Sequence, residues 1–169
     1  MTYTTTAAYT RTNTAVHLSG VIMGTISDIL SQLQVDLTTL FRDWAQNETA
    51  ISAWIEEGSL SEVVLECHQP NGTVSPVLEF PVTYTVGGAA DSAFTADRAA
   101  LARYRAKLTS VPRGTTAVLV CTFNWSPHKQ MAGWGPGTRA QVGGLQANRF
   151  GTLGTAPDAS VGLRILGSW

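Results

Sequence analysis

Residues 62–85 read EVVLECHQPNGTVSPVLEFPVTYT, in which two β-rich runs flank an Asn-Gly pair. Because Asn-Gly favours a tight hairpin turn, the runs Glu62–His68 and Val77–Thr85 are predicted to be antiparallel strands. Pro76 and Pro81 lack the N–H group that a ladder needs. We therefore expect the second strand to lie at an edge of the sheet, or to carry a bulge near Pro81.

Upstream of this hairpin the hydrophobic period becomes that of a helix. Thr14–Val35 is predicted to be a broad amphipathic helix, because its apolar residues recur on one face: Leu18, Ile22, Ile26, Ile29 and Leu33. A second helical stretch follows, with Asp36 as its N-cap, a break at Asn47 and a stop at Gly58. Residues 2–12 are rich in Thr and Tyr and are expected to form an edge strand or an ordered arm.

Downstream of the hairpin, after Gly87 and Gly88, a helix is predicted over Asp97–Ser110 with Thr95 as its N-cap. Thr115–Phe123 is nearly all apolar or β-branched, so we expect a strand that is covered on both faces. This order of helices, hairpin, helix and strand predicts an α+β fold with a mainly antiparallel sheet.

The last part of the chain has a different character. Residues 125–169 hold nine glycines and only five charged residues, which is too apolar for a solvated tail and too glycine-rich for a rigid core element. We expect this segment to lie on the domain in more than one way, either anchored or incidentally packed through Trp125, Trp134 and Trp169. A chain of 169 residues fits a single domain, which we divide into a core (1–124) and a terminal region (125–169).

The composition limits the classes of function. Hydrophobic residues make up 44% of the chain and charged residues only 14%, whereas ~25% charged residues is usual. Such a sparsely charged surface points to protein partners. With a net charge of −1 and no basic cluster, nucleic-acid binding is not expected. Because we find neither a signal-peptide pattern nor a run of ~18 apolar residues, we expect a cytoplasmic protein without a membrane partner.

Candidate catalytic and metal-binding residues are few and scattered. His17, His68 and His128 show no zinc-site spacing, so no metal and no cofactor are expected. Cys67 and Cys121 lie in apolar runs and are predicted to be buried thiols. A disulfide between neighbouring strands and a catalytic cysteine are the alternatives. No residue is assigned a catalytic role, and the chain is not expected to be an enzyme.

Several motifs taken together resemble the bacterial HORMA-domain family. In the helical part these are Ser27-Asp28-Ile29-Leu30, Phe41-Arg42-Asp43-Trp44, and Ala53–Leu60 running into Val63–Glu66. In the terminal part they are Gly133–Arg139, Gly144-Leu145 and Phe150–Leu153. The likeness covers nearly the whole chain, and the order and spacing of the motifs are more specific than any one of them.

The resemblance implies a HORMA fold, in which three helices pack on a central, mainly antiparallel sheet and a mobile C-terminal safety belt closes over a peptide. The implied partners are a closure-motif peptide or a second HORMA protein, a CD-NTase cyclic-oligonucleotide synthase and an AAA+ remodelling ATPase. In anti-phage (CBASS) operons the closed state would bind and activate the synthase, and the ATPase would open it.

By the same resemblance, the peptide would lie between the helix predicted at Asp97–Ser110 and the terminal region, beside Thr115–Phe123. The wall of this site would be formed by Leu101, Tyr104, Arg105, Leu108, Val118 and Val120. The belt would be carried by Trp134, Thr138, Arg139, Leu145, Phe150 and Leu153. Judged from the residues alone, the alternative is a structural or assembly protein of a phage or secretion particle.

Overall fold

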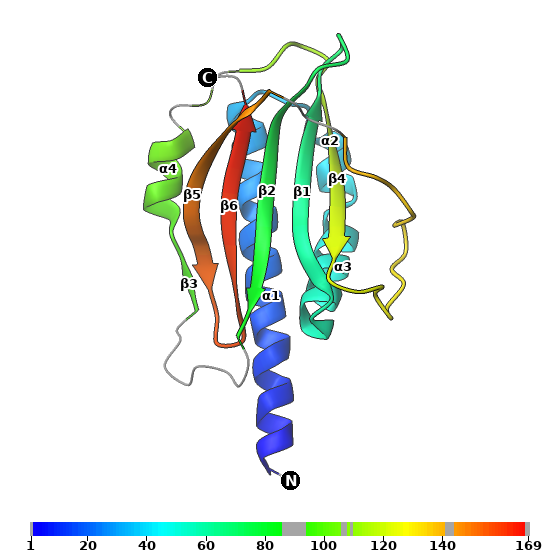
Figure 1. The fold of residues 1–169 in the computed structure, drawn as a ribbon, viewed down its shortest axis with the longest axis vertical. Helices are drawn as coiled ribbons and strands as arrows, with labels where there is room; N and C mark the ends of the chain where they lie inside the picture. The colour runs from blue at the N-terminus through cyan, green and yellow to red at the C-terminus, as the bar shows by residue number, and fades with distance from the viewer. Residues whose placement is uncertain (1, 86–93, 106–107, 109, 141–143, 168–169) are drawn as a thin grey trace.

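The computed structural model describes residues 2–85, 94–105, 108, 110–140 and 144–167. The elements follow in the order α1 (Thr2–Gln32), α2 (Thr38–Arg42), α3 (Trp44–Glu57), β1 (Leu60–His68), β2 (Val74–Tyr84), β3 (Thr95–Ala96), α4 (Arg98–Arg105), β4 (Thr116–Phe123), β5 (Gln146–Thr155) and β6 (Ala159–Gly167). Six strands form one antiparallel sheet in the order β3-β5-β6-β2-β1-β4, with α1, α2 and α3 behind it (Figure 1). With α2 and α3 counted as one broken helix, this is the predicted α+β arrangement of three helices and an antiparallel sheet.

Helix α1 supplies the centre of the hydrophobic core. Its predicted apolar stripe is fully buried, which confirms the amphipathic helix: Leu18, Ile22, Ile26 and Ile29 are each 0% exposed. The helix begins at Thr2, so the strand or arm expected for residues 2–12 is wrong. Extending an existing helix adds a hydrogen bond per residue at little cost, and this outweighs a weak β-preference. The span Thr10–Gln32 is long and apolar enough to cross a membrane, but 56% of its most apolar window is buried inside the fold.

The second helical stretch is broken, as predicted, but at Asp43; Asn47 lies inside α3. The residue that caps α2 is Leu37, and Asp36 helps from one position earlier, since its Oδ1 accepts the N–H of Thr38 at 3.0 Å. Gly58 ends α3 with a φ of 83°, a left-handed conformation that favours glycine.

Strands β1 and β2 form the predicted hairpin, with Val64 opposite Glu79. The edge position expected for the second strand is wrong, because β2 lies between β1 and β6. The bulge expected near Pro81 is absent from the β2–β6 ladder, whose register is the same before Pro81 (Glu79 opposite Arg164) and after it. The hairpin ladder shifts register instead between Glu66 and His68, where three steps of β2 (Val77 to Val74) face two steps of β1, so the extra residue lies in β2 beside Pro76. Gly87 and Gly88 lie outside the described residues.

The chain after β4 does not form one uniform terminal region. Strands β5 and β6 form a second hairpin, and β6 pairs with β2 in the middle of the sheet. Since β6, β2 and β1 separate β5 from β4, residues 124–145 must cross the width of three strands. We call these residues the β4–β5 connection.

The two ends of the sheet hold the predicted helix and the predicted strand that were both expected to lie next to the peptide. Helix α4 is shorter than the predicted Asp97–Ser110 and contacts β5 at one end. Thr95 is not its N-cap, because it pairs with Thr155 in β3. Strand β4 lies at the other end and is only half-buried, so the expectation of a strand covered on both faces is wrong. An apolar composition did not distinguish an end strand from a central one.

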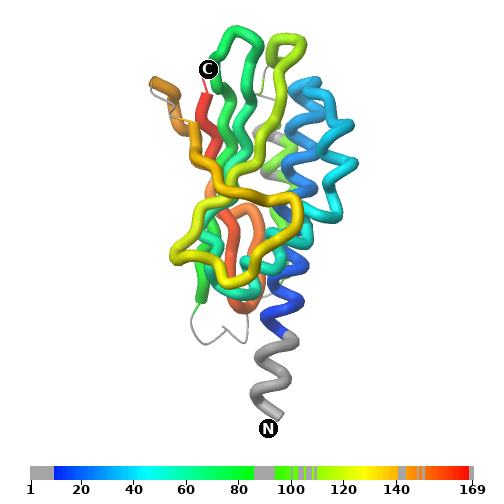
Figure 2. The backbone as a smooth tube through the Cα atoms, turned by 90° about the vertical axis from the view of Figure 1, so that its right-hand side faces the viewer, coloured from blue at the N-terminus to red at the C-terminus, as the bar shows by residue number. Residues whose placement is uncertain are grey.

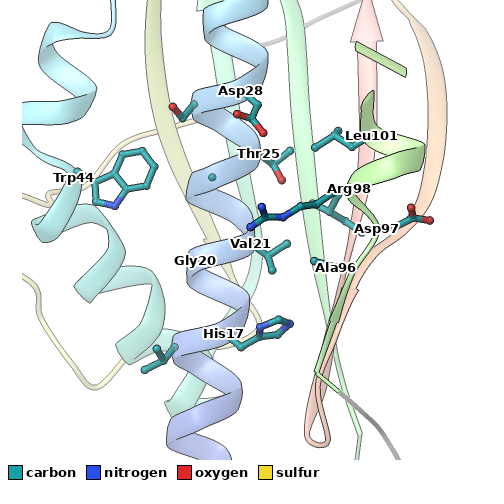
Figure 3. A pocket seen from close by; sticks show the side chains of 14 residues that line it. His17, Gly20, Val21, Thr25, Asp28, Trp44, Ala96, Asp97, Arg98 and Leu101 are labelled. Atoms are coloured by element: carbon teal, nitrogen blue, oxygen red, sulfur yellow. The ribbon is translucent and has the colours of Figure 1, made fainter. Parts of the chain in front are cut away.

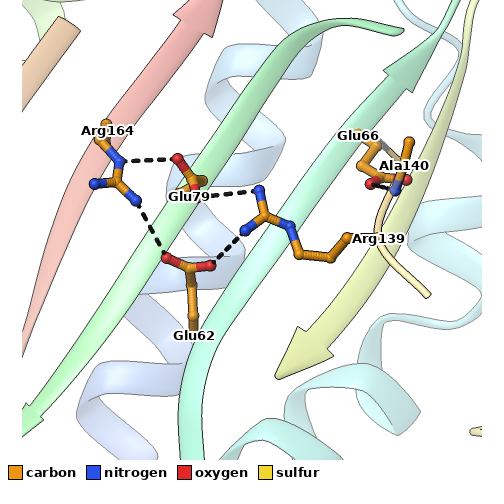
Figure 4. Close-up of polar contacts among 6 residues, drawn as sticks. All are labelled: Glu62, Glu66, Glu79, Arg139, Ala140 and Arg164. Atoms are coloured by element: carbon orange, nitrogen blue, oxygen red, sulfur yellow. Dashed lines mark hydrogen bonds and ion pairs between the residues drawn. The ribbon is translucent and has the colours of Figure 1, made fainter. Parts of the chain in front are cut away.

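Side chains alternate between two unlike faces of the sheet. The face toward the helices is apolar and includes Val63, Leu65, Leu78 and Phe80. The opposite face carries charged residues in the central strands: Glu62 and Glu66 in β1, Glu79 in β2 and Arg164 in β6 (Figure 4). Buried charges of this kind need partners, and the β4–β5 connection supplies some of them.

Candidate functional site at the end strand

The outer edge of β4 has no partner strand among the described residues. Only its other edge is paired, to β1, with Val64 opposite Val120 and Glu66 opposite Val118. Val118 is 42% exposed although it lies in a strand of apolar sequence. An edge of this kind presents a row of backbone N–H and C=O groups with which an extended chain can pair.

The β4–β5 connection passes around this edge from the helix side of the sheet to the opposite side (Figure 2). Its first half is fixed to α3 by side chains that bind its backbone. The indole Nε1 of Trp54 donates to Lys129 O at 2.9 Å, and Glu57 Oε1 accepts the N–H of His128 at 2.7 Å. The Gln46 amide donates to Ala132 O. Three points on one helix thus hold the start of the connection.

Glu57 is suited to this role because its carboxylate is satisfied from several sides. The hydrogen bond from Ser59 Oγ lowers the pKa of Glu57 most, and the backbone N–H groups of His128 and Lys129 lower it further, against burial, which raises it. The ionised form is therefore favoured, and it accepts hydrogen bonds without competing as a donor.

Trp134 is the apolar anchor of the connection. Its ring meets Trp54 edge to face at a centroid distance of 5.2 Å, and Trp54 in turn meets Phe123 at 5.0 Å. The residue before it, Gly133, has a φ of 81°, and a Cβ atom there would collide with the Gln46 side chain. The backbone conformation therefore favours glycine, and a larger residue would also displace the Gln46 amide from Ala132 O.

A groove of about 360 Å³ lies between the end strand, the helices and the anchor. It is lined from the helices by Leu40 and Asn47, from β4 by Thr116 and Val118, and from the β4–β5 connection by Gly133 and Trp134. The lining is mixed, with apolar walls and a few polar groups, as in sites that bind peptides or small ligands.

The second half of the connection crosses the charged face of the sheet (Figure 4). Arg139 Nη1 lies 3.2 Å from Glu62 Oε1, and Arg139 Nη2 lies 3.0 Å from Glu79 Oε2. The N–H of Ala140 donates to Glu66 Oε2 at 2.6 Å, while His68 Nε2 lies 3.0 Å from the other oxygen of Glu66. The connection is therefore held by contacts with the core on both sides of the end strand.

A second groove, of about 550 Å³, lies at the opposite end of the sheet between α1 and α4 (Figure 3). Gly20 and Gly24 form part of its α1 wall, and His17, Asp28 and Arg98 contribute polar groups. Arg105 Nη1 lies 3.9 Å from Asp28 Oδ2 nearby. None of the residues that line this groove belongs to β4 or to the β4–β5 connection.

The structure divides the six residues predicted to form the peptide-binding wall. Val118 and Val120 lie on β4, as expected. Leu101, Arg105 and Leu108 lie in or just after α4, at the other end of the sheet, where Leu101 and Leu108 are core residues. The side chain of Tyr104 lies outside the described residues. One wall that combines both sets is therefore wrong, because four strands separate β5, which α4 contacts, from the outer edge of β4.

The residues predicted for the belt also divide. Trp134, Thr138 and Arg139 lie in the β4–β5 connection, and Leu145 lies at its end. Leu153 is 2% exposed in β5 and belongs to the core, so its assignment to a mobile segment is not supported by its position. The Phe150 side chain lies outside the described residues. The prediction missed Gln46, Glu57, Glu62 and Glu79; acidic residues within β-rich runs were the one available signal for the last two.

The two cysteines do not form a reactive site. Cys67 and Cys121 are both free, and β1–β4 pairing places Cys121 opposite Val63 rather than opposite Cys67. Burial raises the pKa of each thiol to about 12, so neither is a ready nucleophile. Among the described residues, no group of three or more His, Cys, Asp or Glu side chains is placed to hold a metal ion.

Solved structures of protein complexes contain chains with the same fold. A chain of the mitotic checkpoint complex matches with a TM-score of 0.72 at 10% identity, over 90% of this chain and 97% of that one. HTP-1 of C. elegans, bound to the HIM-3 closure motif, matches with a TM-score of 0.68 at 12% identity, over 88% and 87%. A chain of the HORMA–CdnC–Trip13 complex of E. coli MS115-1 matches with a TM-score of 0.63 at 12% identity, over 94% and 90%.

At these identities the likeness shows the fold alone. A sequence search of curated proteins gave no match. The family model described as bacterial HORMA domain 2, however, matches residues 3–162, which is nearly the whole chain. The chain therefore belongs to the bacterial HORMA domain family.

Proposed function

We propose that this protein captures an extended peptide at the outer edge of β4, with the β4–β5 connection acting as the safety belt that closes over it. One observation carries the proposal: β4 is an end strand whose outer edge has no partner in the described chain, and the connection passes around that edge. Addition of a strand would satisfy the exposed backbone groups of β4, and side chains of the peptide would enter the groove beside Trp134.

The larger assembly is proposed from the relatives. The E. coli complex contains a HORMA chain together with CdnC and Trip13, and HTP-1 is bound to a closure motif. By analogy, this cytoplasmic, non-enzymatic protein in its peptide-bound state binds and activates a CD-NTase synthase in anti-phage signalling, and an AAA+ ATPase opens it. The peptide is supplied by a partner or by a second HORMA protein.

To test peptide capture, the full chain is panned against phage-displayed random peptides of about eight to ten residues, the upper end of the usual range of strand length. Affinities of enriched peptides are then measured for Trp134→Ala and for Trp125→Ala. Both remove an indole from the β4–β5 connection, but only Trp134 lines the groove; Trp125 lies over Gly58.

We expect Trp134→Ala to weaken binding about tenfold or more, since buried Trp anchors often contribute over ~1.4 kcal/mol. Trp125→Ala is expected to bind like the unchanged protein. If no peptide is enriched, or if both variants bind equally well, the proposal is wrong. Activation is tested separately, by measuring cyclic-oligonucleotide formation by a purified CD-NTase with the chain, with and without the enriched peptide.

A further inference from the structure

We propose that Glu62 and Glu79, which we call the acid pair, form a socket for two arginines of the C-terminal segment, by which we mean the β4–β5 connection together with β5 and β6. Arg139 and Arg164 are the positioning residues that keep this segment in its closed arrangement, in which the connection crosses the sheet. The proposal deepens the proposed function, because it names what fixes the closed arrangement. Its test needs no peptide, so either proposal can fail without the other.

The four side chains form one cluster on the face of the sheet away from the helices (Figure 4). Arg164 Nε lies 2.8 Å from Glu79 Oε1, and Arg164 Nη2 lies 3.7 Å from Glu62 Oε2. Arg139 contacts the remaining oxygen of each acid, at 3.2 Å from Glu62 and 3.0 Å from Glu79. Each carboxylate is thus shared by both guanidinium groups.

The origin of the four residues makes the cluster specific for one arrangement of the chain. Both acids belong to the β1–β2 hairpin, which packs on α1 and α3 and is part of the core. Both cations come from the chain after β4: Arg139 from the β4–β5 connection and Arg164 from β6. The contacts therefore exist only while the connection crosses this face and β6 pairs with β2.

Burial makes the acid pair dependent on these cations. The side chains of Glu79 and Glu62 are only 5% and 13% exposed, and they lie on adjacent strands of the same face. Two neighbouring carboxylates with little access to water repel each other, and a carboxylate without a partner is costly to bury. Arg139 and Arg164 reduce this cost, and each guanidinium bridges the two carboxylates and so fixes the position of the segment.

Charged groups from three elements surround the Glu62 carboxylate in the described part of the chain. Glu79 faces it from β2, Arg164 from β6 and Arg139 from the β4–β5 connection, while β4 presents the uncharged Thr122 opposite to it. Burial and then Glu79 raise the pKa of Glu62, against Arg139 and Arg164, which lower it. Removal of Arg139 therefore leaves an excess of negative charge that one proton relieves.

Hydrogen exchange of the full chain, read by mass spectrometry, tests the proposal. The variants are Arg139→Gln, Arg139→Lys and the double variant Glu62→Gln/Arg139→Gln. Arg42→Gln is the control, since it removes the same charge from a contact with Asp43 that is remote from the cluster. The reporters are peptic fragments covering residues 130–140 and 159–167, with fragments of α1 as the internal reference.

For Arg139→Gln we expect about tenfold faster exchange over residues 130–140, the effect of one lost charge-assisted contact, and unchanged α1. Arg139→Lys is expected to retain much of the protection. The ratio of exchange rates between Arg139→Gln and the unchanged protein should fall toward one as the pH is lowered and the acid pair takes up a proton. In the double variant Arg164 faces one ionised carboxylate, Glu79, so exchange over residues 159–167 should match the unchanged protein while exchange over 130–140 stays fast.

The proposal is overturned if Arg139→Gln exchanges like Arg42→Gln over residues 130–140. It is also overturned if the rate ratio is independent of pH, because a purely steric role for Arg139 would give that result. If Arg139→Gln accelerates exchange equally in α1, the variant has lost the fold as a whole, and Arg139→Lys then decides. Exchange over residues 130–140 that is equal in Arg139→Lys and in the unchanged protein supports the socket. Exchange there that is as fast in Arg139→Lys as in Arg139→Gln overturns it.

Discussion

Glu79 and Arg164 are direct cross-strand partners in the β2–β6 ladder, and Arg164 Nε lies 2.8 Å from Glu79 Oε1. Glu79 holds the pKa of Arg164 above its usual value through this hydrogen bond. The pair joins the first hairpin of the chain to the last, across 85 positions of sequence. It thereby ties the C-terminal strands to the core at the centre of the sheet.

The two members of the acid pair are predicted to differ in their contribution to stability. Glu79→Gln removes the close contact to Arg164 and is expected to lower the free energy of unfolding by about 1–2 kcal/mol at neutral pH. Glu62→Gln is expected to change it little or to increase it, because the raised pKa shows that the ionised form of Glu62 is disfavoured in the fold. Urea unfolding of both variants measures the difference; an equal loss in both would contradict this account.

Glu57→Gln is predicted to destabilise the protein in a pH-dependent way. The pKa of Glu57 is lowered in the fold, so its ionised form adds stability above the unfolded-state pKa, and this contribution is lost as the pH falls through the folded-state pKa. The melting temperature of the variant should therefore lie below that of the unchanged protein at neutral pH and approach it in acid. Glu56→Gln, one position away, is the control, and a constant difference at every pH would refute the prediction.

Gly58→Ala is predicted to cost about 1 kcal/mol or more, since alanine is strained at a φ of 83°. The added Cβ itself would meet Trp125 at 3.6 Å, an ordinary contact. The loss should therefore come from the backbone and not from a clash. Gly24→Ala is the control, because α1 is helical there and no atom lies within 4 Å of the added Cβ; thermal unfolding should show it unchanged or more stable.

Cys67 and Cys121 are predicted to resist alkylation in the folded protein. Burial raises the pKa of both thiols to about 12, so little thiolate is present at neutral pH. Iodoacetamide labelling followed by mass spectrometry should give two slow sites in buffer and two fast sites in urea. Rapid labelling of either cysteine in buffer would show that its strand opens to solvent more readily than the packing indicates.

The sequence predicted those parts of the fold that depend on neighbours along the chain. The helical period of α1, the glycine stop at Gly58 and the Asn-Gly hairpin are local signals, and each was confirmed. The position of a strand in the sheet is not a local property. The apolar run of β4 is equally compatible with a central strand and with an end strand, and only the pairing of β6 with β2 assigns it to the end.

The candidate site was predicted in part for the same reason. The glycine-rich composition singled out the segment with Trp134 and Arg139, but it did not separate this segment from β5 and β6, which belong to the sheet. Its partners could not be found, since Glu57, Glu62 and Glu79 come from elements that precede it by many residues. Leu101 was assigned to the wall with Val118 by the family resemblance, and the sequence alone does not show that α4 and β4 lie at opposite ends of the sheet.

The path of the β4–β5 connection has a topological consequence. It is joined covalently to β4 at one end of the sheet and to β5 beyond three intervening strands, so together with the sheet it makes a closed ring. A strand held inside such a ring cannot leave sideways. A peptide captured as proposed must slide out lengthwise, or β5 and β6 must first detach. Its residence time would then be set by the unfolding rate of a hairpin and not by the strength of the interface. A mechanical linkage of this kind is durable without tight binding.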